Sequence, residues 1–230
     1  MIDFTNLPQR KKAYAGANGS KISVVYNNEL YMLKFPPPPT KNKEMSYTNS
    51  CICEYIGCHI FELLGIPVQE TMLGTYTVNG KEKIVVACKD FTSPGKLLQD
   101  FASLKNQVIT SPRGGYGTDL YDVMTAIEDQ TSIDPRVLKE HFWNMFIVDA
   151  LIGNWDRHNG NWGFLYDEIT DTQTLAPVFD CGSSLYPQAD EDMMVHVLAN
   201  KNEIQYRIYE HPNSSLTIDK KRIKYYDYIT

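Results

Sequence analysis

A run of apolar residues from Val137 to Ile152 constrains the fold more than any other feature of the chain. The run is apolar almost all round a helical wheel, and it includes Phe142, Trp143, Met145, Phe146, Ile147 and Leu151. A helix of this kind is usually buried on all sides, so we expect one long helix at the centre of a substantial core. The run ends at Gly153, which attaches the following polar loop to the most rigid element of the chain.

One charged residue, Asp149, lies inside this apolar run. An isolated buried carboxylate costs several kcal/mol, or it takes up a proton and becomes neutral. We therefore expect Asp149 to have a partner, and to anchor the backbone of the loop that follows the helix.

Three polar residues after the helix have an informative spacing. Asn161 follows Asp156 by five residues, and Asp180 opens an Asp-x-Gly motif that ends at Gly182. This is the spacing by which kinases place a base beside two metal ligands. The loop alone is more typical of a simple polar turn, but together with the Asp-x-Gly motif it indicates a phosphoryl-transfer site.

Two short apolar runs, 162–165 and 174–179, flank a polar segment and predict a β-hairpin. If the hairpin is centred on residues 170 and 171, Asn161 and Asp180 lie opposite one another at its open end. Directly opposed residues of antiparallel strands have Cα atoms about 4.5–5.5 Å apart. An amide oxygen and a carboxylate at that separation can share one Mg²⁺ ion, while Asp156 faces the attacking hydroxyl.

Length and composition are those of an ordinary globular protein with one large domain or two lobes. The chain has 230 residues, of which 43% are hydrophobic and 22% are charged. Its net charge of −6 disfavours a broad nucleic-acid-binding surface, so the basic runs 10–12 and 220–222 are interpreted as solvated faces. No apolar run reaches the roughly 18 residues that a membrane span needs, and the N-terminus has no secretory signal. We expect a cytoplasmic protein.

The cysteines are interpreted as small buried thiols in a reducing compartment. They contain no C-x-x-C pair, and no second pair completes a zinc site. The five residues are Cys51, Cys53, Cys58, Cys88 and Cys181.

The first part of the chain is rich in strand patterns. Runs at 21–26 and 29–35 are separated by Asn27-Asn28, and runs at 71–77 and 83–88 by a turn at Asn79-Gly80; such dipeptides are typical of hairpins. Near Phe91 the pattern changes to helices and loops, which predicts a boundary between two lobes.

A helix is predicted between the two hairpins, over residues 45–64, with Ser46 or Ser50 as its N-cap. Its stripe of isoleucines, which continues to Leu63, is expected to pack on the sheet. Glu54 lies on the opposite stripe with Cys58 and Phe61. A carboxylate in an apolar stripe suggests a partner, although an exposed helix charge is an equally good interpretation.

Lys34 is the candidate partner of Glu54. It ends the strand at 29–35 with apolar neighbours on both sides, which is the setting of a lysine that binds nucleotide phosphates. The alternative is a lysine that protects an edge strand from aggregation. The glycine-rich turn from Gly16 to Lys21 is a weak phosphate-loop signal, because it fits neither common glycine motif. The segment 85–91 lies at the lobe boundary, where its backbone could bind adenine.

Four segments together resemble HipA-type bacterial serine/threonine kinases, and the resemblance runs over nearly the whole chain. They are 15–18, 31–36, 153–161 and 179–182; the catalytic-loop match is highly specific and the glycine-loop match moderately so. The resemblance implies an α+β, two-lobed protein-kinase-like fold that uses ATP and Mg²⁺. The strand-rich N-terminal lobe would be 1–91, and the mainly helical C-terminal lobe 92–230.

The resemblance also assigns roles to residues. Asp156 would be the catalytic aspartate, Asn161 and Asp180 the metal ligands, and His158 with Arg157 would organise the catalytic loop. Ten further residues are expected to bind the nucleotide, either from the resemblance or from the arguments above. They are Gly16, Ala17, Asn18, Gly19, Ser20, Lys21, Lys34, Glu54, Lys89 and Phe91.

Two departures from the family matter. HipA toxins carry a phosphorylatable serine shortly before the phosphate loop, where this chain has Ala13-Tyr14-Ala15. The family also continues beyond the segment equivalent to residues 225–228, so we expect the C-terminal lobe to be incomplete at its end.

The leading function is therefore an ATP-dependent protein kinase that modifies Ser or Thr, with autophosphorylation. The expected partners are a protein substrate and an antitoxin-like or host protein; export without a readable signal stays open. One alternative is a phosphoinositide-kinase-like enzyme acting on a lipid or small molecule, which would be expected to show a basic headgroup pocket. Another is a nucleotide-binding module that transfers nothing.

Overall fold

The chain folds as two compact units, described here by a computed structural model of residues 1–14, 20–39, 46–110 and 113–230. The first unit contains residues 1–91 and 181–200, and the second contains 92–180 and 201–230. Each unit combines strands and helices, so the mixed α and β composition expected from the sequence is confirmed. The lobe limits at 91 and 230 stay a prediction, and segment 181–200 groups with the first unit.

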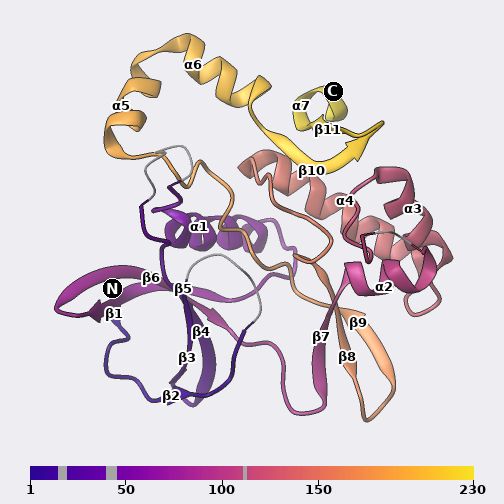
Figure 1. Cartoon of the computed structure of the whole chain (residues 1–230), viewed down its shortest axis with the longest axis horizontal. Coiled ribbons are helices and arrows are strands. Elements are labelled where there is room, and N and C mark those ends of the chain that lie inside the picture. The colour runs from indigo at the N-terminus through magenta and orange to yellow at the C-terminus, as the bar shows by residue number, and fades with distance from the viewer. Residues whose placement is uncertain (15–19, 40–45, 111–112) are drawn as a thin grey trace. The chain divides into compact units, whose positions relative to one another are not determined.

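A six-stranded sheet forms the first unit, with the strand order β1-β5-β6-β4-β3-β2 (Figure 1). All neighbouring strands are antiparallel except β1 and β5. The bounds are β1 Ile2–Asp3, β2 Gln9–Arg10, β3 Lys21–Tyr26, β4 Glu29–Lys34, β5 Thr71–Val78 and β6 Lys81–Lys89. The two turns predicted between these strands are present, and Asn27, Asn28, Asn79 and Gly80 all have positive φ, as tight hairpin turns require.

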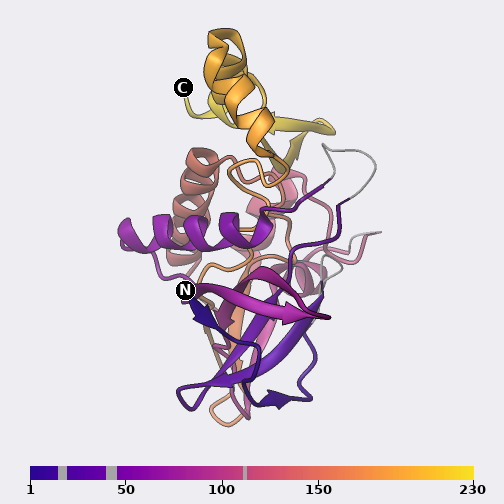
Figure 2. The same ribbon diagram turned by 90° about the vertical axis from the view of Figure 1, so that its left-hand side faces the viewer.

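One face of this sheet carries the main core of the unit, formed by Phe4, Val24, Tyr31, Leu33, Phe35, Val85 and Ala87. Helix α1, Ser50–Leu63, contacts β5 and β6 (Figures 1 and 2). The buried residues Cys51, Val86 and Cys88 form a smaller cluster. Helix α5, Glu191–Ala199, also belongs to the first unit and has no buried residue.

Helix α1 departs from the sequence prediction in two respects. It begins at Ser50 with Asn49 as N-cap, rather than with either predicted serine. The predicted isoleucine stripe does not face the sheet, since Ile56 is 41% and Leu63 is 86% exposed. The buried face is instead the one that carries Glu54, because small cysteine side chains allow close packing there.

The second unit contains the long helix α4, Pro135–Ile152 (Figure 1). Its other helices are α2 Phe101–Val108, α3 Leu120–Asp129, α6 Lys201–Gln205, the π-helical turn η2 Tyr206–Glu210, and α7 Tyr225–Ile229. Its strands are β7 Lys96–Asp100, β8 Gly163–Asp167, β9 Thr172–Leu175, β10 Asn213–Ile218 and β11 Lys221–Lys224. They form a three-stranded sheet, β7-β8-β9, and a two-stranded hairpin, β10-β11.

Helix α4 has the sequence signals of both its ends. The Asp134 side chain accepts a hydrogen bond from the Arg136 backbone N–H, Pro135 occupies the first turn, and Gly153 ends the helix with φ +64°. The prediction of burial on all sides was wrong, because Ile147 and Leu151 are 49% and 69% exposed. One face of the helix packs into the core and the opposite face is open in the described residues.

The hairpin β8–β9 is present, but its register differs from the prediction. Phe164 pairs with Leu175 and Asp167 with Thr172, so its centre is one residue earlier than predicted. If the same register continued beyond the strands, Asn161 would lie opposite residue 178 rather than residue 180. The difference arises in the turn, where the Asp167 side chain accepts hydrogen bonds from the backbone N–H groups of Ile169 and Thr170.

Within the described parts of the chain, no helix combines the length and hydropathy that a membrane crossing requires.

Candidate functional site

The second unit brings the three polar residues of the kinase-like spacing together through Arg157. Its Nη1 atom donates a hydrogen bond to the backbone oxygen of Asn161 at 2.7 Å, and a second one to the backbone oxygen of Phe179. Residue 179 directly precedes Asp180. One guanidinium nitrogen therefore joins the end of the catalytic loop to the start of the Asp-x-Gly motif.

A buried ion pair holds Arg157 in place. Its Nε and Nη2 atoms donate to the two oxygens of Asp149 at 2.9 and 3.2 Å, and Asn154 Nδ2 donates to Asp149 at 2.9 Å. Asp149 and Asn154 are 0% exposed and Arg157 is 6% exposed. Burial raises the pKa of Asp149, while the charge of Arg157 opposes that rise.

The expectation that Asp149 is paired is thus confirmed, and its link to the loop backbone is indirect. Its carboxylate binds the side chains of Asn154 and Arg157, and these in turn reach the loop backbone. Asn154 Oδ1 accepts from the Asp156 N–H at 3.2 Å. The helix therefore fixes the loop through two intermediate side chains.

Asp156 is partly buried beside this network. Its backbone oxygen accepts hydrogen bonds from His158 N at 2.8 Å and from Asn161 Nδ2 at 2.9 Å. Burial raises the pKa of the Asp156 carboxyl; the charge of His158 lowers it, the charge of Asp180 raises it, and Arg222 lowers it. The interaction of the two carboxylates shows that Asp156 and Asp180 lie close enough for their charges to couple.

Asn161 is oriented by the same contacts. Because its Nδ2 atom donates to the Asp156 carbonyl, its Oδ1 atom points elsewhere, and within the described residues that oxygen has no hydrogen-bond partner. His158 Nδ1 accepts from the Gly160 N–H at 3.0 Å. The imidazole thus closes the turn, and the organising role of His158 in catalysis stays a prediction.

The first unit contains the predicted pair of Lys34 and Glu54. Lys34 Nζ lies 3.0 Å from Glu54 Oε2, with 15% and 2% of the two side chains exposed. The interpretation of Glu54 as an exposed helix charge is therefore wrong. Glu54 Oε1 also accepts from the backbone N–H of Cys181 at 3.1 Å, so one carboxylate holds both the lysine and the backbone of Cys181.

Lys21 lies directly across from Lys34 in the β3–β4 ladder. Directly opposed residues point to the same face of a sheet, and two like charges there are unfavourable without a compensating charge. Glu54 compensates Lys34 in part. The ends of these two strands therefore carry two neighbouring lysines, and their role in binding phosphate stays a prediction.

The other residues assigned to the nucleotide have a mixed outcome. Gly16, Ala17, Asn18 and Gly19 lie outside the described residues, and the Ser20 carbonyl accepts from Phe35 N at 3.0 Å. The assignment of this segment to a phosphate loop stays a prediction.

Lys89 is engaged within its own unit. Its backbone N–H donates to Glu70 O, its carbonyl accepts from Gln69 Nε2, both at 2.9 Å, and its ammonium pairs with Glu29 at 2.6 Å. The role of Lys89 and Phe91 in binding adenine stays a prediction.

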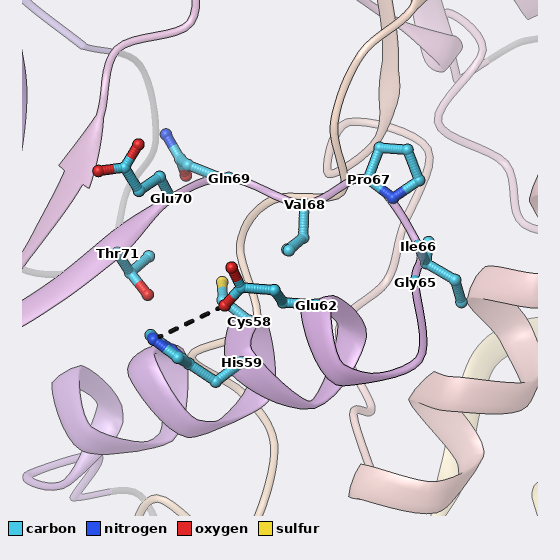
Figure 3. Close-up of a pocket in the computed structure, with 10 residues that line it drawn as sticks. All are labelled: Cys58, His59, Glu62, Gly65, Ile66, Pro67, Val68, Gln69, Glu70 and Thr71. Carbon is cyan, nitrogen blue, oxygen red and sulfur yellow. Dashed lines mark ion pairs between the residues drawn. The ribbon is translucent and has the colours of Figure 1, made fainter.

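A cavity of about 480 Å³ opens in the first unit where α1 ends and the chain returns to β5 (Figure 3). Cys58, His59, Glu62 and Thr71 turn toward it, and the segment 65–70 forms its other wall. None of the residues that line it is assigned to phosphoryl transfer. It is therefore a separate feature from the candidate site.

Sequence reasoning missed several residues that support the catalytic loop. Asn159 Nδ2 donates to the backbone oxygens of Gly115 and Gly117 at 2.8 and 2.9 Å, and Lys105 Nζ donates to the same Gly117 oxygen at 2.6 Å. Ser215 Oγ binds the Arg157 carbonyl at 2.5 Å. These contacts join residues from 12 to 58 positions apart, and no local pattern announces them.

The five cysteines are buried thiols, as expected, and they form no disulfide with one another. In the described part of the chain, no cluster of three or more His, Cys, Asp or Glu residues could hold a metal ion. An Asn with an Asp is a smaller donor set, and it fits Mg²⁺, which usually takes one or two protein carboxylates and completes its shell with phosphate and water oxygens.

Comparison with known proteins identifies the family of the chain. The family described as the HipA-like C-terminal domain matches residues 10–225. The serine/threonine-protein kinase CtkA of Helicobacter pylori is 55% identical over 231 residues, which cover 100% of this chain and 70% of the relative.

A solved structure shows the same fold. The crystal structure of a Helicobacter pylori proinflammatory kinase, CtkA, has a TM-score of 0.91 and 53% identity with this chain, and the match covers 99% of this chain and 76% of that one. The kinase-like fold expected from the sequence is thereby confirmed. The protein belongs to the family of HipA-like C-terminal domains and is a kinase of HipA type.

Proposed function

We propose that this protein transfers the γ-phosphoryl group of ATP to a Ser or Thr hydroxyl of a protein, its own chain included. The observation that carries the proposal is the contact of Arg157 with the backbone at Asn161 and Phe179. This contact supports the proposal because it joins the backbone at Asn161, five residues after the candidate base, to the backbone next to Asp180. The name of the CtkA relative supports the choice of a Ser or Thr acceptor.

Asp156 would orient the acceptor hydroxyl and receive its proton. As the bond from the acceptor oxygen to the γ-phosphorus forms, the bond from that phosphorus to the β-γ bridging oxygen breaks, and ADP leaves. Burial raises the pKa of the Asp156 carboxyl, which makes it a better proton acceptor than an exposed aspartate.

Asn161 and Asp180 would hold Mg²⁺, which supplies positive charge to the phosphate oxygens when bound. The hydrogen bond from Asn161 Nδ2 to the Asp156 carbonyl leaves the amide oxygen for the metal. Lys34, and Lys21 opposite it, would bind phosphate oxygens, and Glu54 would keep the Lys34 ammonium in position.

Purified protein incubated with γ-labelled ATP and Mg²⁺ tests the proposal, beside Asp156→Ala and Asp180→Ala. Asp129→Ala is the matched control, because Asp129 is exposed on α3 in the same unit and outside the site. We expect label on protein Ser or Thr, lost in both site variants and retained in the control. Full transfer by Asp180→Ala would remove the metal assignment.

Two results would replace the proposal by another function. Label on an added phosphoinositide but not on protein would identify a lipid kinase. Binding of ATP without transfer to any acceptor would leave a nucleotide-binding module. Mass spectrometry of the labelled residue then distinguishes modification of the chain itself from modification of an added protein.

A further inference from the structure

The hairpin β10–β11 carries a concentration of positive charge that the proposed function does not yet use. Residues 213–224 contain one acid, Asp219, and four bases, of which Lys220, Lys221 and Arg222 are consecutive. All three are exposed. Asp219 and Lys220 have φ values of 50° and 64°, which form the tight turn at the tip of the hairpin.

Direct hydrogen bonds attach this hairpin to the catalytic loop. Ser215 Oγ on β10 donates to the Arg157 carbonyl at 2.5 Å, and Tyr225, which follows β11, donates to the Asn154 carbonyl at 2.6 Å. Ser215 is 6% and Tyr225 is 2% exposed. The basic hairpin is therefore fixed to the loop that contains Asp156, rather than being a mobile appendage.

Arg222 lies near the place where the acceptor hydroxyl would bind. Its charge lowers the pKa of the Asp156 carboxyl, against the larger effect of burial. Arg222 and its partner Thr217 are opposed in the hairpin register, and Thr217 N donates to Thr118 O at 2.8 Å, so both strands of the hairpin are held in position.

Ion pairing on this hairpin is uneven in the described part of the chain. Among the residues that the structure describes, Lys220, Lys221 and Arg222 have no ion pair, whereas Lys224 on the same strand pairs with Glu210 at 2.6 Å. The chain as a whole has a net charge of −6. Three basic side chains without an ion pair, on a hairpin attached to the catalytic loop of an acidic protein, are therefore a local feature.

We propose that Lys220, Lys221 and Arg222 bind acidic residues that flank the Ser or Thr acceptor in the protein substrate. The inference rests on the proposed kinase function, and it names the substrate class as Ser or Thr in an acidic sequence. An acidic peptide fits better than a nucleic acid, because the positive surface is confined to one hairpin. A peptide bound at Asp156 would place its flanking residues within the roughly 8–10 Å over which exposed charges act at physiological salt.

Two peptides with the same central serine test the proposal, one with Asp and Glu flanks and one with Asn and Gln at the same positions. We expect the KM of the acidic peptide to be about 10-fold lower, with the difference reduced by added salt. In Lys220→Gln/Lys221→Gln the KM of the acidic peptide rises several-fold, while kcat with the neutral peptide stays the same. Adding Arg222→Gln to this double variant raises the KM of the acidic peptide further. Replacing that third change by Arg222→Lys restores most of the preference for the acidic peptide that Arg222→Gln removes.

Lys81→Gln/Lys83→Gln is the matched control for the double variant, since both are exposed strand lysines of the first unit and their loss removes the same two positive charges. We expect it to keep the preference. Equal KM values for the two peptides in the unaltered protein, or an unchanged preference in the triple variant, would overturn the proposal. So would a rise in the KM for ATP alone, because the hairpin would then serve the nucleotide.

Binding of the fluorescently labelled peptides, measured by anisotropy, separates this inference from the proposed function. Selective binding of the acidic peptide that the triple variant loses would support the surface even if no phosphate is transferred, and only the kinase assignment would then fail. No selective peptide binding, or stronger binding of a labelled oligonucleotide that the triple variant loses, would reject the acidic-peptide assignment.

Discussion

Removal of the Asp149 carboxylate should unfold the candidate site more than any other single loss of charge in the second unit. The change Asp149→Ala leaves the Arg157 guanidinium, which is 6% exposed, without the two hydrogen bonds that it donates at 2.9 and 3.2 Å. It also removes the acceptor of Asn154 Nδ2. An unpaired buried charge of this kind costs about 3–5 kcal/mol.

The size of the effect makes it measurable in thermal unfolding. A protein of 150–250 residues loses roughly 2–4 °C in Tm for each kcal/mol, so a loss of about 4 kcal/mol corresponds to about 10 °C. Asp149→Asn should lose less, because the amide oxygen still accepts one hydrogen bond. Asp129→Ala, an exposed carboxylate of the same unit, should change stability by about 0.5 kcal/mol or less.

A double-mutant cycle tests whether the pair itself is responsible. In Asp149→Leu/Arg157→Met both charges are absent, so no buried charge is left unpaired, and the double variant should be more stable than the sum of the single losses predicts. It should still be inactive, because the carbonyls of Asn161 and Phe179 lose their shared donor. A loss below about 1 kcal/mol in Asp149→Ala, or strictly additive losses, would refute this account of the site.

Three further changes have expected outcomes. Glu54→Ala should lower kcat/KM on the order of 100-fold. Glu54→Gln should lower it less, because its amide oxygen can still accept from the Cys181 N–H. Equal losses in the two variants would contradict a role for the contact with Cys181. Burial lowers the pKa of His141 to about 4, so on acidification the unfolded chain takes up a proton at this residue before the folded chain does. The free energy of unfolding, measured by chemical denaturation, should therefore fall as the pH is lowered from 6.5 to 4, by at most about 3 kcal/mol before solvent screening. His141→Gln should flatten this slope. Gly115→Ala should destabilise the second unit by about 3 kcal/mol or more, since φ is +83° and a Cβ would lie 1.8 Å from Ala102 O; a Tm equal to that of the unaltered protein would contradict it.

The elements that sequence predicts well are those whose signals are local. The strand limits of β3 match the prediction, and the turns at Asn27-Asn28 and Asn79-Gly80 occur where expected, because a two-residue turn with positive φ determines the pairing of its own strands. Helix α4 has a capping aspartate, a first-turn proline and a final glycine within its own sequence. Such elements need no information from distant residues.

The failures concern choices that depend on tertiary contacts. Both faces of α1 contain apolar residues, and periodicity alone does not show which of them packs on a sheet; the Glu54 face is buried because Lys34 and the Cys181 N–H satisfy its carboxylate. Strand β7 also escaped prediction. It pairs with β8 over Lys96–Asp100, although its own sequence alternates too weakly to indicate a strand.

The candidate site shows how two segments can meet although the pairing predicted to join them is wrong. The predicted hairpin placed Asn161 opposite Asp180, whereas the register of β8 and β9 runs two residues out of step with that pairing. The two backbone segments nevertheless meet, because Arg157 Nη1 donates to the carbonyls of both Asn161 and Phe179 beyond the end of the ladder. A buried guanidinium therefore holds the two backbone segments together. A change in the β8–β9 turn should accordingly alter the site far less than a change at Arg157.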